Sequence, residues 1–163
     1  MTDVLVIGYG NPLRRDDGVG PVVAGRLLKA GPPASVAVLI CHQLTLEMAE
    51  PLSQAAHVIL IDAARNGVPG QIACREIQPD TGLPPTLLHH MTPGALLAGT
   101  QALYGRAPHT LLYTITGASF AYGEGLTTVV EAAALELCTR LEYLLQRMAG
   151  ESILHLPPEF GCA

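Results

Sequence analysis

The chain has 163 residues, of which 49% are hydrophobic and 14% are charged, a balance that allows a sizeable core and argues against disorder. This length suits a single domain over residues 1–150, followed by a short tail at 151–163. The net charge of −5 argues against binding to nucleic acid, and no apolar run reaches the ~18 residues of a membrane span. Met1-Thr2-Asp3 has an acid where a signal peptide is basic, so we expect a cytoplasmic protein.

Short apolar strands and helices alternate along the first half of the chain. Residues 4–7 are apolar and mostly β-branched, as in a strand buried on both faces, and apolar residues recur at helical spacing over 18–30. A second strand is predicted at 36–40, then a helix at 44–56 in which Pro51 marks a break or a second start. The strand at 57–61 is as apolar as the first, and residues 71–77 alternate as in an edge strand.

The second half continues the same pattern after a proline-rich link at 78–85. A helix is predicted at 92–104 with Pro93 in its first turn, then a strand at 111–115 and a long amphipathic helix at 127–148. Because most strands are followed by a helix, we predict an α/β fold with a mainly parallel sheet of about five strands between two helical layers. Ligands of such sheets bind beyond the carboxyl ends of the strands.

Residues 8–20, which follow the first strand, are the most informative segment. Leu13 stands where a GxGxxG dinucleotide fingerprint needs glycine, and no P-loop lysine follows. Asp16 and Asp17 would also repel a phosphate at the start of the next helix. By position Asp16 is the better cap for that helix, which leaves Asp17 near the mouth of the sheet as either a functional or a second structural carboxylate.

Further polar residues follow at the same predicted edge. Asp62 comes directly after a buried strand, where it serves chemistry or caps the turn at Asn66-Gly67. His89-His90 precede the helix at 92–104, and each is either functional or structural. Two carboxylates and one imidazole suit a divalent ion such as nickel, zinc or cobalt.

These residues together resemble the hydrogenase maturation proteases, over residues 4–147. The opening segment is similar to the family's N-terminal signature in the residues Gly8, Gly10, Asn11, Leu13, Asp16, Asp17, Gly18 and Gly20. Asp62 and His90 recur where the family would have them. The segments 43–47, 89–93, 103–105, 117–120 and 123–126 look closer to the branch that serves soluble, NAD-reducing hydrogenases.

The resemblance implies a twisted, mainly parallel sheet and a narrowly specific endopeptidase. Such an enzyme removes the C-terminal extension of a nickel–iron hydrogenase large-subunit precursor after nickel insertion, with the substrate's nickel as recognition element. Asp17, Asp62 and His90 would contact that nickel, and His89 is the alternative imidazole. We expect no tightly bound resident metal, since three ligands on separate loops bind an ion weakly without substrate.

The catalytic group and the reaction class remain open at this point. The chain has neither the HExxH motif of a resident zinc nor the GxSxG motif of a serine nucleophile. An aspartyl-type mechanism, with Asp17 or Asp62 as general base, is our hypothesis. The alternatives are a nickel-sensing assembly factor that binds the precursor without cutting it, and a small-molecule hydrolase that uses the same edge for another metal.

Overall fold

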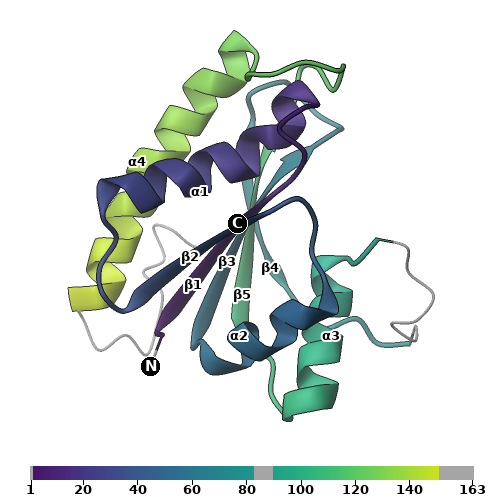
Figure 1. Ribbon diagram of the computed structural model, residues 1–163, viewed down its shortest axis with the longest axis vertical. Helices are drawn as coiled ribbons and strands as arrows, with labels where there is room; N and C mark the ends of the chain where they lie inside the picture. The colour runs from purple at the N-terminus through teal and green to yellow at the C-terminus, as the bar shows by residue number, and fades with distance from the viewer. Residues whose placement is uncertain (1, 83–89, 151–163) are drawn as a thin grey trace.

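The computed structural model describes residues 2–82 and 90–150, and its centre is a five-stranded sheet (Figure 1). The strand order is β2-β1-β3-β5-β4. Four strands run parallel, and β4 pairs antiparallel with β5 at the edge. Their bounds are Val4–Tyr9 for β1, Val36–Cys41 for β2, His57–Ala64 for β3, Ile72–Ile77 for β4 and His109–Thr116 for β5. The predicted mainly parallel sheet and its edge strand are confirmed.

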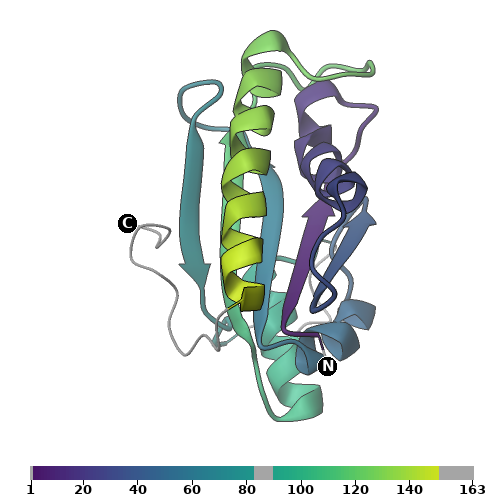
Figure 2. The ribbon, with the colours of Figure 1, turned by 90° about the vertical axis from the view of Figure 1, so that its left-hand side faces the viewer.

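Helices cover both faces of this sheet, so the molecule has three layers (Figures 1 and 2). The helices α1 (Val19–Ala30) and α4 (Thr128–Gly150) pack on one face, and α2 (Ala49–Gln54) and α3 (Pro93–Tyr104) pack on the other. Successive strand residues point to opposite faces. Val6 therefore belongs to the apolar core under α1 and α4, and Ile7 belongs to the core under α2 and α3.

One predicted helix differs in detail from the observed structure. The helix predicted at 44–56 is a short 3₁₀ turn, η2 (Leu46–Met48), followed by α2. Pro51 does not break α2, because it lies in the first turn, where a backbone N–H has no partner within the helix. By contrast, the start of α3 agrees with the prediction: Pro93 is its first residue, and the Thr92 hydroxyl accepts a hydrogen bond from the Ala95 N–H at 3.1 Å.

A close approach between α1 and the strands positions the loop that follows β1. A Cβ atom at Gly8 would lie 2.2 Å from the carbonyl oxygen of Gly20, and one at Gly20 would lie 2.4 Å from the carbonyl oxygen of Ile61. Both positions therefore need glycine. The tight packing brings the start of α1, and the loop before it, directly over the ends of β1 and β3.

Within the ranges 2–82 and 90–150, no helix is both long and apolar enough to span a bilayer. The predicted tail at 151–163 lies outside the described residues and stays a prediction.

Candidate functional site

Three of the residues singled out from the sequence line one cavity of about 200 Å³ at the carboxyl edge of the sheet. Asp17 lies in the 3₁₀ turn η1 (Arg15–Gly18), Asp62 lies near the end of β3, and His90 precedes α3. The two carboxylates are partly buried and His90 is exposed, so the cavity opens to solvent. His89 lies outside the described residues. The cavity is completed by Tyr9, Gly10, His42, Gln43, Leu44 and Met91.

Backbone N–H groups orient both carboxylates. The Asn11 N–H donates to Asp17 Oδ2 at 2.9 Å, and the Ala63 N–H donates to Asp62 Oδ1 at 2.7 Å. Asp62 lies within β3 rather than after it, because this strand extends to Ala64, beyond the predicted end at residue 61. The sheet itself therefore holds the Asp62 backbone, whereas the loop after β1 holds Asp17.

Burial raises the pKa of the Asp62 carboxyl to about 6. The charge of Asp17 adds to this rise, whereas hydrogen bonds from Ala63 and Tyr9 and the charge of Arg65 oppose it. A carboxyl group with a pKa near neutral pH can both accept and release a proton under physiological conditions. Asp62 is therefore suited to general acid–base chemistry.

Tyr9 is a site residue that the sequence analysis missed. Its phenol forms a hydrogen bond with Asp62, and burial, followed by the Asp62 charge, raises the pKa of Tyr9 well above its ordinary value. The phenol therefore keeps its proton and acts as the donor to the carboxylate. Tyr9 could have been predicted from the sequence, because it follows an apolar strand at the edge where ligands are expected.

His42 and Gln43 are also site residues that the sequence analysis missed, although they follow a predicted strand at the edge where ligands are expected. They follow β2 directly, and β2 pairs with β1 so that Cys41 lies opposite Tyr9. The Gly10 N–H donates to the Cys41 carbonyl at 3.2 Å, which extends this pairing past the end of β1. The cavity therefore contains a second described imidazole besides His90.

Asp16 has a different role from the predicted helix cap, and that prediction is wrong. The residue is fully buried, and its carboxylate accepts hydrogen bonds from the N–H groups of Ala118, Ser119 and Thr127 and from the Thr127 hydroxyl, at 2.7–3.0 Å. Burial alone would raise the pKa of Asp16, but these bonds outweigh it and lower the pKa. The N-cap residue of α1 is Gly18, which has no side chain that could accept a hydrogen bond from the helix.

The cavity is not a ready-made metal centre. Within residues 2–82 and 90–150, no group of three carboxylate, imidazole or thiol side chains is arranged to hold a metal ion. Asp17, Asp62 and His90 share a cavity, but an ion bound by all three would draw these side chains closer together.

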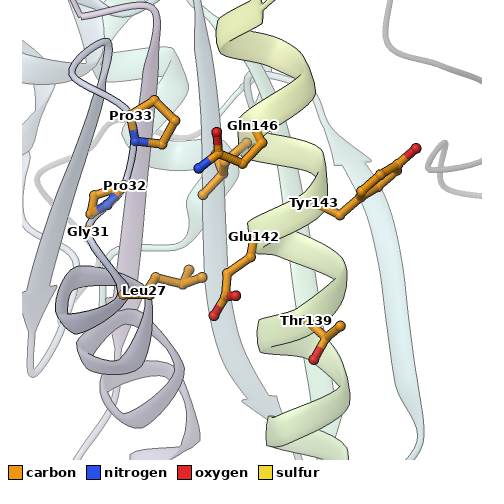
Figure 3. Close-up of a pocket in the computed structure, with 10 residues that line it drawn as sticks. Leu27, Gly31, Pro32, Pro33, Thr139, Glu142, Tyr143 and Gln146 are labelled. Carbon is orange, nitrogen blue, oxygen red and sulfur yellow. The ribbon is translucent and has the colours of Figure 1, made fainter.

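A second cavity, of about 320 Å³, lies between α1 and α4 (Figure 3). Leu27, Pro32 and Pro33 line one side of it, and Glu142 extends into it from α4. The ten residues that line this cavity include one carboxylate and no imidazole or thiol. The chemistry expected for hydrolysis is therefore gathered at the strand ends and not here.

The fold matches that of known hydrogenase maturation proteases. The NiFe hydrogenase maturation protease HycI from Thermococcus kodakarensis is 20% identical with a TM-score of 0.73, over 89% of this chain and 93% of that chain. The hydrogenase maturating endopeptidase HybD from E. coli is 22% identical with a TM-score of 0.71, over 90% and 93%. The hydrogenase 2 maturation peptidase from a Thaumarchaeota archaeon is 25% identical with a TM-score of 0.66, over 91% and 99%.

Comparisons of sequence alone add no family to this result. No protein-family model matches the chain, and no curated protein matches it. The shared property is therefore the α/β fold, over nearly the full length of the compared proteins.

Proposed function

We propose that this protein is a hydrogenase maturation endopeptidase, which removes the C-terminal extension of a nickel–iron hydrogenase large-subunit precursor. The observation that carries the proposal is the cavity shared by Asp17, Asp62 and His90 at the carboxyl edge of the sheet. The fold shared with HycI and HybD supports it, as does the signature at residues 8–20. In this proposal the protein acts in the cytoplasm, and the branch it serves is that of the soluble, NAD-reducing hydrogenases.

Nickel enters this proposal as part of the substrate. Two carboxylates and an imidazole are suitable ligands for a borderline divalent ion, and an ion between Asp17 and Asp62 would relieve the repulsion between them. An ion fixed in the precursor would also place the scissile bond at a defined position in the cavity. The same contacts explain why only nickel-loaded precursor would be cut.

Asp62 is our choice for the group that activates water, in an aspartyl-type mechanism. Its pKa of about 6 leaves it mostly ionised at neutral pH, so it can accept a proton from water and return it to the leaving amine. The hydrogen bond from Tyr9 orients the carboxylate for this transfer. Asp17, whose carboxylate accepts a hydrogen bond from the Asn11 N–H, is then the carboxylate more suited to the ion.

The deciding experiment is an incubation of the protein with large-subunit precursor in nickel-loaded and nickel-free forms, read by intact mass. We expect loss of a C-terminal peptide from the loaded form only. Cleavage of both forms would contradict the nickel requirement. Stable complex formation without any change of mass would instead support an assembly factor, and would overturn the endopeptidase.

The choice between the two neighbouring histidines needs its own comparison. We expect His90→Gln to lower the rate of precursor cleavage by about 10²-fold or more, because it removes an imidazole from the cavity. His89→Gln is the matched control and should change the rate less than about threefold. The reverse order of effects would assign the site to His89.

A further inference from the structure

An exposed apolar and aromatic surface lies at the same end of the sheet as the cavity. Tyr122 is 83% exposed and Leu13 is 52% exposed, so two large side chains present apolar atoms to solvent here. The Gly123 N–H donates to the Leu13 carbonyl at 2.9 Å, so the two segments lie side by side. Figures 1 and 2 show them together, one purple and one green, at the end of the molecule where β1 and β3 terminate. We call Leu13, Arg14 and Tyr122 the rim surface.

The rim surface is held by a rigid frame. The Arg15 N–H donates to the Gly123 carbonyl at 3.0 Å, and the Asp16 N–H donates to the Ser119 carbonyl at 3.1 Å. Below these bonds, the buried Asp16 carboxylate ties segment 117–127 to the loop after β1. A backbone that is already fixed loses little further conformational entropy when a partner binds. This frame therefore favours a binding surface.

The composition of the rim surface is typical of a protein-binding site with a positive margin. The Arg14 guanidinium lies 5.1 Å from the centre of the Tyr122 ring, in a cation–π arrangement, and Arg15 is exposed beside it. Tyrosine and arginine are the residue types that most often dominate interface energies. Arg14 and Arg15 give this surface two positive charges, while the exposed Glu124 lies two residues from Tyr122, so acidic groups of a partner are favoured opposite the arginines.

The rim surface is joined directly to the cavity. The Leu13 N–H donates to Asn11 Oδ1 at 3.0 Å, and the Asn11 N–H donates to Asp17 Oδ2 at 2.9 Å. A partner seated on Leu13 and Tyr122 is therefore held against the same short loop that orients Asp17. A protein substrate whose tail enters the cavity would rest its folded body here.

We propose that the rim surface docks the folded body of the precursor, with Leu13 and Tyr122 against an apolar depression and Arg14 against acidic groups at its border. This inference rests on the proposed function and names the part of this chain that recognises the substrate outside the cleaved tail. In this arrangement, docking determines substrate affinity, and the cavity determines the chemical step.

The test is the steady-state cleavage of nickel-loaded precursor by Tyr122→Ala and Leu13→Ala enzymes. We expect KM to rise about tenfold for each variant, while kcat changes less than about twofold. Tyr143→Ala is the matched control, since Tyr143 is a 53% exposed tyrosine on α4 with Arg147 5.9 Å from its ring centre. The control should keep the wild-type KM, and Tyr122→Phe should keep most of the affinity because the ring is retained.

Folding and binding measurements separate this inference from the proposed function. Far-UV circular dichroism should show that both alanine variants are folded. If the wild-type enzyme cuts the precursor and neither variant raises KM, docking at the rim surface is wrong. If the wild-type enzyme cuts nothing, the endopeptidase fails, and the affinity of the uncut precursor then decides: a loss of about tenfold in Tyr122→Ala supports docking, and an unchanged affinity overturns it.

Discussion

Asp16 and Asp17 are neighbours in the chain, yet they belong to two different regions of the molecule. Asp16 is fully buried, and four donors from segment 117–127 satisfy its carboxylate. The region around Asp17 is a solvent-open cavity, where the Asn11 N–H donates to its carboxylate. The Asp16 carboxylate thus joins the loop after β1 to segment 117–127, while the Asp17 carboxylate lines the cavity, and substitution can separate the two.

The largest effect that we expect from this comparison is on activity at Asp17. Asp17→Asn removes a charge from the cavity and should lower the initial rate of precursor cleavage by about 10²- to 10⁴-fold. The thermal midpoint should stay within a few degrees of the wild type, because Asp17 is only partly buried and Asn retains an acceptor for the Asn11 N–H. Intact-mass kinetics and calorimetry on the same preparation measure both quantities.

Asp3→Asn is a suitable control for the Asp17 prediction, since Asp3 is exposed and precedes β1. It should keep the wild-type cleavage rate. Near-normal turnover by Asp17→Asn would mean that Asp17 takes no part in cleavage. The proposed functional difference between Asp16 and Asp17 would then be wrong.

The second prediction concerns stability at Asp16. Asp16→Asn replaces one acceptor oxygen with an N–H₂ group that faces N–H donors, so it should lower the free energy of unfolding by about 2–4 kcal/mol. The effect comes from the native state, where the carboxylate joins Thr127 to the loop after β1. Urea unfolding at pH 7 measures it, with Asp17→Asn as the comparison. An equal loss of unfolding free energy in both variants would contradict the assignment of a structural role to Asp16 and a functional role to Asp17.

Much of the fold and part of the site could be predicted from the sequence for a common physical reason. Buried parallel strands appear in the sequence as apolar runs. A polar residue that follows such a run therefore lies at the carboxyl edge of the sheet, where ligands bind. This local pattern locates Asp17 and Asp62 without knowledge of the strand order. Glycines at 8 and 20 belong to the same local pattern, because they allow the close contact between β1 and α1.

The remaining features depend on contacts between segments that are distant in the chain. Asp16 looks like a helix cap in its local sequence, but its partners Ser119 and Thr127 are more than 100 residues away. The acid–base properties of Asp62 likewise depend on burial and on Tyr9, which comes from another strand. Hydrogen-bond partners and burial of this kind follow from tertiary packing, which no local pattern contains.

The third prediction extends the comparison to Asp62, a partly buried carboxyl group that we expect to have the opposite effect on stability from Asp16. Burial raises the pKa of Asp62 to about 6 in the folded state, against an ordinary value of 3.8, so ionisation at neutral pH opposes folding. Asp62→Asn should therefore raise the free energy of unfolding by about 1–3 kcal/mol at pH 7.5, while it lowers the cleavage rate by about 10²-fold or more.

The pH dependence distinguishes this explanation from a general packing effect. Between pH 6 and 3.8 the folded wild type progressively holds a proton that the unfolded chain lacks, so the advantage of Asp62→Asn should shrink across that window and vanish below it. Urea unfolding in the presence of EDTA at pH 7.5, 6.0, 5.0 and 4.0 (values chosen around the two pKa values) follows the difference. A difference that stays constant across this series would mean that desolvation of the Asp62 charge is not its cause. If Asp62→Asn is instead less stable than the wild type at pH 7.5, the ionised Asp62 carboxylate stabilises the fold, as that of Asp16 does. In that case, neighbouring groups compensate its charge.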